Sequence, residues 1–266
     1  MNELYQPDLE NPIIETKIKP APSSKEELSV DRKTQIVVFV LGFLGLNLFA
    51  SILVFFLQAF FKKVPGIIYP GYFSTFAFSG MVNGIIYFLL LVLMMIPLGS
   101  YFPEIKKAVL QKRPWLKGIV YSIIIIFLSG FYNVLLQLLG LTVSDNANQT
   151  AVVQIVSHSP FDSFIWIVLL GPIVEEFTYR LGLFGWLKKK NRILAYLGTM
   201  LIFGLIHFDF FNPDLVNELL NLPSYIIGGA ILCVAYDKDG LGTSIAAHVY
   251  NNLLSFMMIF LGNLLI

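Results

Sequence analysis

Polar side chains with chemical potential occur at three places inside long apolar stretches of this sequence. The first place carries two acids and a base, the second an aromatic ring and a histidine, and the third a histidine and an amide: Glu175, Glu176, Arg180; Phe203, His207; His248, Asn252. Ionisable groups in hydrocarbon are costly, so they are rare there and usually have a function. Together these residue types supply the groups that a hydrolase needs.

The spacing within the motifs predicts which side chains share a helix face. Glu176 and Arg180 are four residues apart, so we expect them to form a structural ion pair. Glu175 is turned about 100° from Glu176 around a helix, which leaves it free to face another partner. His248 and Asn252 are also four residues apart and project to one side.

Peptide hydrolysis requires an activated water, a group that stabilises the oxyanion and a proton for the leaving amine. A glutamate in a low-dielectric pocket makes a good general base, which is the role we predict for Glu175. We expect His207 to share the water with Glu175, and Phe203 to wall the His207 ring. His248 and Asn252 would donate N–H groups to the developing oxyanion.

A metal site is the competing interpretation of the same residues. Two histidines and a carboxylate form a common catalytic zinc set, which would be Glu175, His207 and His248. However, the zinc-protease pattern H-E-x-x-H is absent, and the two histidines belong to different segments. The sequence therefore favours water activation without a cofactor and keeps a divalent metal such as zinc as the alternative.

Composition places the chain in a membrane. Of its 266 residues, 56% are hydrophobic and only 13% are charged, whereas soluble domains have about 25% charged residues. The mean hydropathy is +0.74. Long apolar runs with few charges predict an integral membrane protein in contact with the lipid bilayer. A net charge of +1 gives no sign of nucleic-acid binding, and the single cysteine, Cys233, lies in an apolar run and predicts a buried residue.

The expected fold class is all-α, a polytopic transmembrane helical bundle of about seven to eight spans around an intramembrane polar chamber. Because a span needs about 20 apolar residues, we predict spans near 36–61, 76–98, 118–140, 163–187, 193–210, 223–236 and 241–265. The predicted division is a disordered cytoplasmic tail, N-terminal transmembrane helices and a catalytic transmembrane domain, at residues 1–33, 34–160 and 161–266 respectively.

Basic residues alternate between the two sides of the predicted bundle. The loops after the second and fourth spans are rich in lysine and arginine. Those after the third and fifth carry only acids, namely Asp145, Asp162, Asp214 and Glu218. The positive-inside rule then predicts a cytoplasmic N-terminus.

The three motifs, E-E-x-x-x-R, F-x-x-x-H and H-x-x-x-N, occur in that order in successive predicted helices. In this they resemble the intramembrane CAAX-processing and bacteriocin-processing (Abi) proteases over roughly residues 163–256. The resemblance implies an endopeptidase of the bacterial plasma membrane that cleaves a membrane-associated peptide or protein. It implies Glu175 and His207 at the water and His248 and Asn252 at the oxyanion. Family members are labelled metalloproteases, yet a metal-free glutamate mechanism is also argued for them, so the metal question stays open.

Other interpretations of the same residues are a non-catalytic membrane regulator or bacteriocin self-immunity protein that uses the site for binding, and a proton-coupled transporter. Ser244, four residues before His248, suggests a serine hydrolase only weakly, because no glycine-framed nucleophile turn accompanies it. Asp237 and Asp239 are expected in a solvated loop rather than as an aspartyl protease pair.

Overall fold

The computed structural model describes residues 28–61 and 76–264, and all regular structure in these ranges is helical. The N-terminal half of the described chain contains α1 (Arg32–Leu44), η1 (Gly45–Phe49), α2 (Ala50–Phe61), α3 (Phe76–Leu98), η3 (Gly99–Tyr101), α4 (Phe102–Leu110), α5 (Lys112–Leu138) and α6 (Ala147–His158). The C-terminal half contains α7 (Pro160–Ser163), η4 (Phe164–Leu170), α8 (Gly171–Glu175), η5 (Glu176–Phe184), α9 (Gly185–Lys188), α10 (Arg192–Leu205), α11 (Leu215–Asp239) and α12 (Leu241–Leu264). Residues 1–27 of the predicted disordered tail lie outside the described residues.

The predicted all-α membrane bundle is confirmed. Five helical stretches of the described chain are long and apolar enough to cross a membrane: Arg32–Leu57, Gly80–Leu110, Lys112–Leu138, Leu215–Asp239 and Leu241–Leu264. The apolar helix α10 is shorter. The span predicted at 163–187 is a helical run, residues 160–188, that includes the wide π-helical turns of η4 and η5. We call residues 160–188 the central run.

One predicted span was too short. The interval 223–236 is part of α11, which begins at Leu215 and contains Pro223 within the helix. Polar residues before Pro223, including Glu218, favoured a loop in the sequence. The structure instead places Glu218 in the first turn of α11 with its side chain fully buried, because hydrogen bonds from neighbouring segments compensate its charge.

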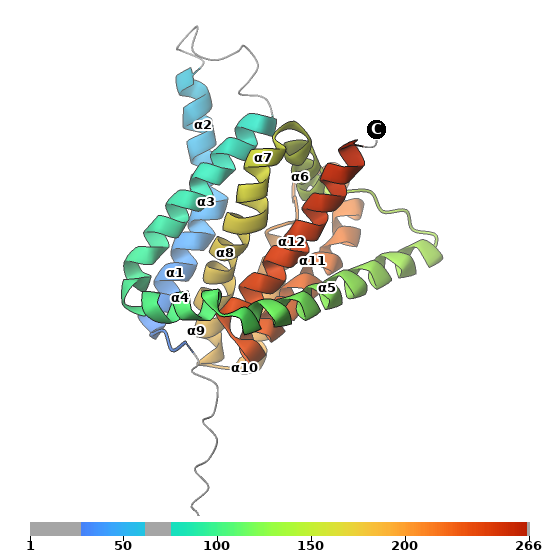
Figure 1. The fold of residues 1–266 in the computed structure, drawn as a ribbon. Helices are drawn as coiled ribbons and strands as arrows, with labels where there is room; N and C mark the ends of the chain where they lie inside the picture. The colour runs from blue at the N-terminus through green and yellow to red at the C-terminus, as the bar shows by residue number, and fades with distance from the viewer. Residues whose placement is uncertain (1–27, 62–75, 265–266) are drawn as a thin grey trace, which may run out of the picture.

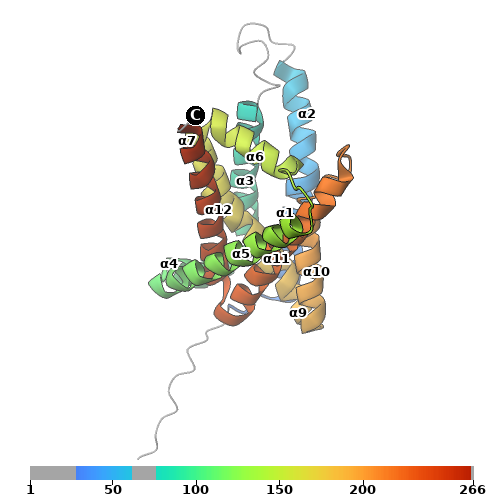
Figure 2. The same ribbon diagram turned by 90° about the vertical axis from the view of Figure 1, so that its right-hand side faces the viewer.

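The central run lies inside the bundle, with α3 and α12 on either side of α8 (Figures 1 and 2). Helix α1 packs against η5 at small residues. A Cβ added to Gly182 would lie 2.9 Å from the backbone nitrogen of Phe39, and one added to Gly42 would overlap the Thr178 side chain. Such residues let membrane helices approach closely. Helix α5 crosses α12 and α11 obliquely, and its far half projects from the bundle (Figures 1 and 2).

The connection between α11 and α12 is a sharp turn at Gly240. Its φ of +86° lies in the region that favours glycine, so the two helices follow each other with a single residue between them. This turn sets the start of α12, the helix that carries His248 and Asn252.

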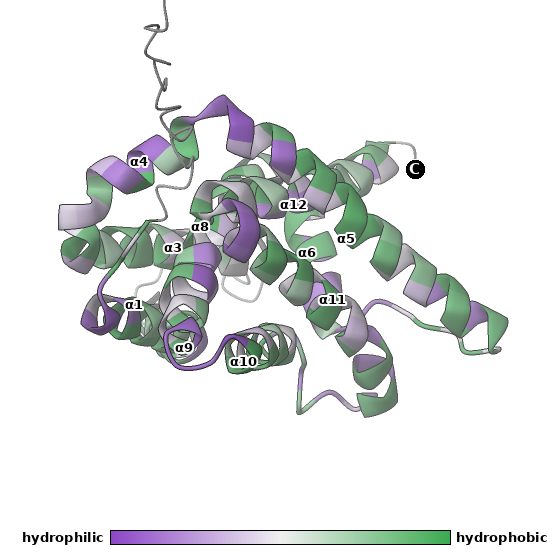
Figure 3. Ribbon diagram, turned by 90° about the horizontal axis from the view of Figure 1, so that it is seen from below, coloured by the Kyte–Doolittle hydropathy of each residue, from purple (hydrophilic) through white to green (hydrophobic). Residues whose placement is uncertain are grey.

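The surface of the bundle divides into apolar sides and a polar end. Large apolar side chains are widely exposed along the helices, among them Ile96 at 74% and Met258 at 76%, as expected for contact with lipid. Figure 3, seen from below, shows hydrophilic residues along α4, at the start of α5 and around α9. The basic residues predicted for one side of the membrane lie in α4, in the first turns of α5, and from the end of α9 to the start of α10: Lys106, Lys107, Lys112, Arg113, Lys117, Lys188, Lys189, Lys190 and Arg192. Cys233 is buried, as predicted.

The expectation of a solvated loop at Asp237 and Asp239 is wrong. Both residues belong to the last turn of α11. The Asp237 side chain is only 2% exposed and pairs with Lys188 at 2.9 Å and Arg192 at 2.6 Å. Asp239 pairs with Lys117 and accepts a hydrogen bond from Tyr121. These acids tie the end of α11 to α9, α10 and α5.

Candidate active site

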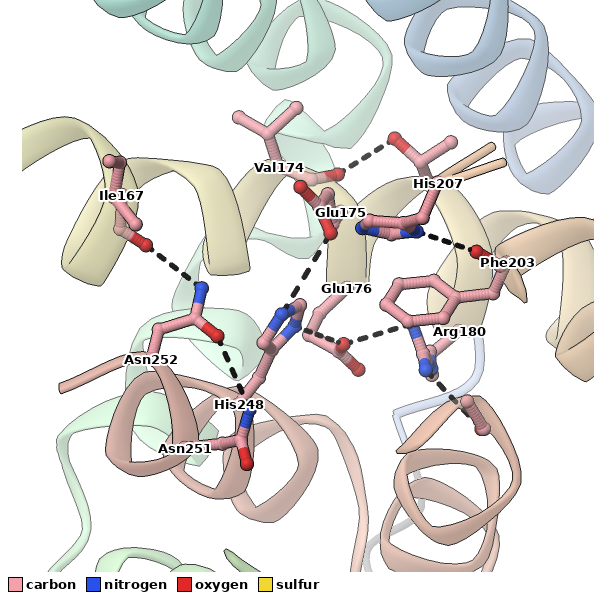
Figure 4. A network of polar contacts seen from close by, with 12 residues as sticks. Ile167, Val174, Glu175, Glu176, Arg180, Phe203, His207, His248, Asn251 and Asn252 are labelled. Carbon is pink, nitrogen blue, oxygen red and sulfur yellow. Dashed lines mark hydrogen bonds and ion pairs between the residues drawn. The ribbon is translucent and has the colours of Figure 1, made fainter. Parts of the chain in front are cut away.

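The two adjacent glutamates stand where the central run changes from α-helix to π-helix. Glu175 is the last residue of α8 and Glu176 is the first of η5. π-Helical turns are rare in proteins, and those that occur are often found at functional sites. In Figure 4 the two side chains point in different directions from one helix, which is the divergence that the sequence predicted.

Glu176 is the centre of a buried ionic cluster. Its Oε1 lies 3.0 Å from Arg180 Nη1, and neither side chain is exposed, so the predicted ion pair is present. The same oxygen lies 2.9 Å from His248 Nδ1. Arg180 also donates to the Gly229 carbonyl over 3.3 Å and lies over the Phe203 ring at 4.3 Å. This cluster joins η5, α10, α11 and α12.

Glu175 faces a cavity of about 230 Å³ that His207 also lines. The other lining residues come from η1, α2, α3 and α6 and from the position directly after α10: Leu46, Asn47, Ala50, Asn83, Ile86, Tyr87, Asn148 and Ile206. The Tyr87 hydroxyl donates to Glu175 Oε1 over 3.3 Å, and His248 Nε2 lies 3.8 Å from Glu175 Oε2. Glu175 therefore has two polar neighbours and is open to the cavity.

His207 follows the end of α10 and is held on several sides. Its Nδ1 lies 2.8 Å from the Phe203 carbonyl, which leaves Nε2 for the cavity when Nδ1 carries the proton. The centroid of the Phe203 ring is 5.1 Å from that of the imidazole, so Phe203 packs beside His207 as predicted. On the other face Tyr225 stacks on the imidazole at 4.6 Å and 15°. Figure 4 shows the rings of His207 and His248 both turned toward Glu175.

His248 and Asn252 project from one side of α12, as their spacing predicts, but lie away from the cavity lining. The Asn252 amide donates to the Ile167 carbonyl over 2.9 Å, and its oxygen accepts from Asn251 at 3.5 Å. One amide hydrogen of Asn252 is therefore used within the fold and one remains. His248 stands between the two glutamates, with one ring nitrogen facing each.

The metal alternative stays a prediction. No group of three His, Cys, Asp or Glu side chains in the described part of the chain is arranged to hold a metal ion. In the set Glu175, His207 and His248, each histidine has its Nδ1 at a protein oxygen, which leaves its Nε2 as the other ring nitrogen; such an Nδ1 contact is also usual for histidines that bind metals. Ser244, the weak serine candidate, is buried and donates to the Leu241 carbonyl over 3.1 Å.

Sequence analysis missed several polar residues that surround the site. Asn83 and Tyr87 lie four residues apart on α3 and both line the cavity; two polar residues at this spacing in an apolar segment were the available signal. Asn148 and Tyr225 carried no such pattern. Four polar cavity residues, Asn47, Asn83, Tyr87 and Asn148, thus come from the region expected to hold only N-terminal transmembrane helices.

Residues 157–254 match the family model described as type II CAAX prenyl endopeptidase Rce1-like. All three motifs lie inside this interval, so the match confirms the resemblance found from the motifs. No curated protein and no solved structure matches the chain.

Proposed function

Starting from the Rce1-like match over residues 157–254, we propose that the protein is an intramembrane endopeptidase. It hydrolyses a peptide bond in a membrane-associated peptide or protein. The observation that carries the proposal is the cavity shared by Glu175 and His207 within an apolar helical bundle. A carboxylate open to a polar cavity, beside an imidazole, is what water activation requires.

The cavity has room for both water and a reacting carbonyl group. Its volume of about 230 Å³ compares with about 30 Å³ for each water in the liquid. Carboxylate, imidazole, phenol and amide groups in its lining offer a water the two to four polar partners that it needs. Hydrolysis inside a membrane consumes water, and these polar side chains provide an environment that can hold it.

Glu175 takes a proton from the water while the water oxygen attacks the peptide carbonyl carbon. His207, through Nε2, holds the same water in position. The tetrahedral oxyanion forms near the α12 side of Glu175, where His248 Nε2 and the second amide hydrogen of Asn252 act as donors. Glu175 then passes the proton to the amide nitrogen as the carbon–nitrogen bond breaks. Glu176 and Arg180 hold His248 in place and do not touch the substrate.

Purified protein should cleave a quenched library of membrane peptides, and Glu175→Gln and His207→Ala should each reduce kcat by at least about a hundredfold, in the range for loss of a general base. Glu104→Gln is the matched control, because Glu104 is an exposed acid on α4. Cleavage by Glu175→Gln at the wild-type rate would refute the mechanism and favour a binding role. A chelator included in parallel tests the metal alternative, since direct glutamate catalysis predicts no loss of activity.

The proposal includes a bacterial plasma membrane with the N-terminus cytoplasmic. The orientation is supported by the lysines and arginines of α4, of the start of α5 and of the α9–α10 connection, where Figure 3 shows hydrophilic residues. Cysteines introduced singly at Gln111 and Phe211, exposed at opposite ends, test it in intact cells. A membrane-impermeant thiol reagent should label the second position and not the first; the reverse pattern would invert the topology.

A further inference from the structure

Glu218 is a buried carboxylate that the catalytic motifs do not include. Its side chain has no exposed surface, and its oxygens accept four hydrogen bonds. The donors are the backbone N–H of Ala147 at 2.8 Å, that of Asp209 at 3.2 Å, the Asn212 amide at 2.7 Å and the Asn146 amide at 3.4 Å. All four donors are uncharged. A buried carboxylate that accepts four hydrogen bonds fixes the position of every segment that donates to it.

The segments held by Glu218 lie on both sides of His207. Asn146 is the N-cap of α6 and accepts from the Gln149 backbone N–H. Its amide also donates to the His207 carbonyl over 3.1 Å. Asp209 follows His207 by two residues, so Glu218 fixes the non-helical chain immediately after the histidine. Through these contacts Glu218 determines where the His207 backbone lies.

The same network fixes the His207 ring. Tyr225, two turns along α11 from Glu218, stacks on the imidazole. The Tyr225 hydroxyl donates to Asn146 Oδ1 over 3.1 Å and accepts from the Asn148 amide at 3.3 Å. Asn148 lines the cavity. The stacking ring, the cavity wall and the backbone of His207 are therefore tied to a single buried group.

We propose that Glu218 is a positioning residue of the active site, which acts through Asn146 and Tyr225 to hold His207 beside Glu175. The inference rests on the proposed function, because the consequence of the positioning is measured as catalysis. Precise placement is a large part of catalytic power, and a displacement of 1 Å can reduce a rate by about a hundredfold.

Glu218→Gln is the sharpest variant. Glutamine keeps the size of the side chain but replaces one accepting oxygen with an N–H₂ donor, which then faces donors whichever way the amide turns. We expect kcat to fall about tenfold with KM changed by less than about twofold, the pattern of a lost transition-state interaction. Tyr225→Phe, which removes only the hydroxyl link, should lower kcat about threefold by the same argument. Asp214→Asn, an N-cap in the same region, should match the wild type, because asparagine caps equally well.

A second readout separates this inference from the proposed function. Diethyl pyrocarbonate modifies histidine rings, and mass spectrometry gives the rate for each of the three histidines. In Glu218→Gln we expect His207 to react several-fold faster than in the wild type, since loss of the clamp frees a stacked ring; exposed His158 is the internal reference.

If the wild type cleaves nothing while His207 still reacts faster in Glu218→Gln, the proposed function fails and the positioning stands. If Glu218→Gln lowers the melting temperature but leaves kcat per folded molecule and the His207 rate unchanged, Glu218 is only structural and the proposal is overturned. Tyr225→Phe decides the question should Glu218→Gln not fold.

Discussion

Two fully buried glutamates in this bundle are compensated in opposite ways. Glu176 lies against the Arg180 guanidinium at 3.0 Å and His248 at 2.9 Å, all within helices of the Rce1-like region. Glu218 accepts four hydrogen bonds from uncharged donors in α6 and the segment after α10. The first holds helices together through charge, and the second holds non-helical chain through hydrogen bonds. Each supports one of the two histidines near Glu175.

Glu175, between these two clusters, is the least compensated of the three acids. Its polar contacts in the described structure are the Tyr87 hydroxyl at 3.3 Å and His248 Nε2 at 3.8 Å. A carboxylate that is fully neutralised makes a poor base, and one without partners is too costly to bury. The contrast is that Glu176 and Glu218 each have short contacts at Oε1 and Glu218 also accepts at Oε2, whereas Glu175, which we expect to react, has longer contacts and faces the cavity.

The largest effect should follow from Arg180→Met. Removal of one partner from a buried ion pair leaves an uncompensated charge and typically costs about 3–5 kcal/mol. We therefore expect the free energy of unfolding in detergent to fall by about that amount. Arg113→Met, an exposed arginine on α5, is the control and should change stability little. A small loss for Arg180→Met would mean that His248 alone neutralises Glu176.

Glu218→Ala should cost less, because no formal charge loses its partner. The truncation leaves four donors without their acceptor. Water that fills the vacated space can accept from most of them, so we expect a loss near that of one unsatisfied group, about 1–3 kcal/mol. Denaturation of the same detergent-solubilised protein measures this loss beside that of Arg180→Met. If Glu218→Ala proved the more destabilising, hydrogen bonds rather than ion pairs would dominate the polar interior, and the comparison would reverse.

Sequence reasoning identified the ionic cluster and not the hydrogen-bonded one, for a physical reason. Glu176 and Arg180 are four residues apart, so helix geometry alone predicts their pairing. The donors to Glu218 include Ala147, which is 71 residues away in the chain, and no local pattern encodes such a contact. Glu218 was therefore assigned to an outer loop. The apolar spans were predictable because their lengths and compositions are local properties, whereas the π-helical turns of the central run and the length of α11 depend on packing.

The division into N-terminal helices at 34–160 and a catalytic domain at 161–266 stays a prediction. The three motifs lie in the second part, yet the cavity is lined from both. Tyr87 on α3 links the two parts directly, since its hydroxyl donates a hydrogen bond to Glu175.

Tyr87→Phe should reduce kcat by roughly fivefold, since its hydrogen bond to Glu175 is long at 3.3 Å and we expect it to contribute about 1 kcal/mol, less than a short bond to a charged group. Because phenylalanine keeps the packing of the ring, we expect the stability of the variant to stay close to that of the wild type, so that a change in kcat reports the hydroxyl alone. Tyr132→Phe is a matched control, as Tyr132 donates to the Leu220 carbonyl away from the cavity. Equal rates for Tyr87→Phe and the wild type would show that Glu175 needs no help from the N-terminal helices.

We expect the smallest effect at an acid that is exposed to solvent. Asp31 is exposed and caps α1; hydrogen bonds, first from the Thr34 hydroxyl and then from the Thr34 N–H and Tyr101, hold its pKa well below the usual range. A carboxyl with a depressed pKa in the folded state stabilises the protein above its unfolded pKa of about 4. That stability declines as the pH falls below this value and is lost only as the pH passes through the depressed pKa of folded Asp31. Asp31→Asn should therefore melt slightly below the wild type at pH 7, and the gap should narrow steadily as the pH is lowered from about 4. Asp162→Asn, an exposed acid on α7, controls for the change in charge. A gap of the same size at pH 7 and throughout the acid range below about 4 would mean that Asp31 acts through the geometry of the cap rather than through its charge.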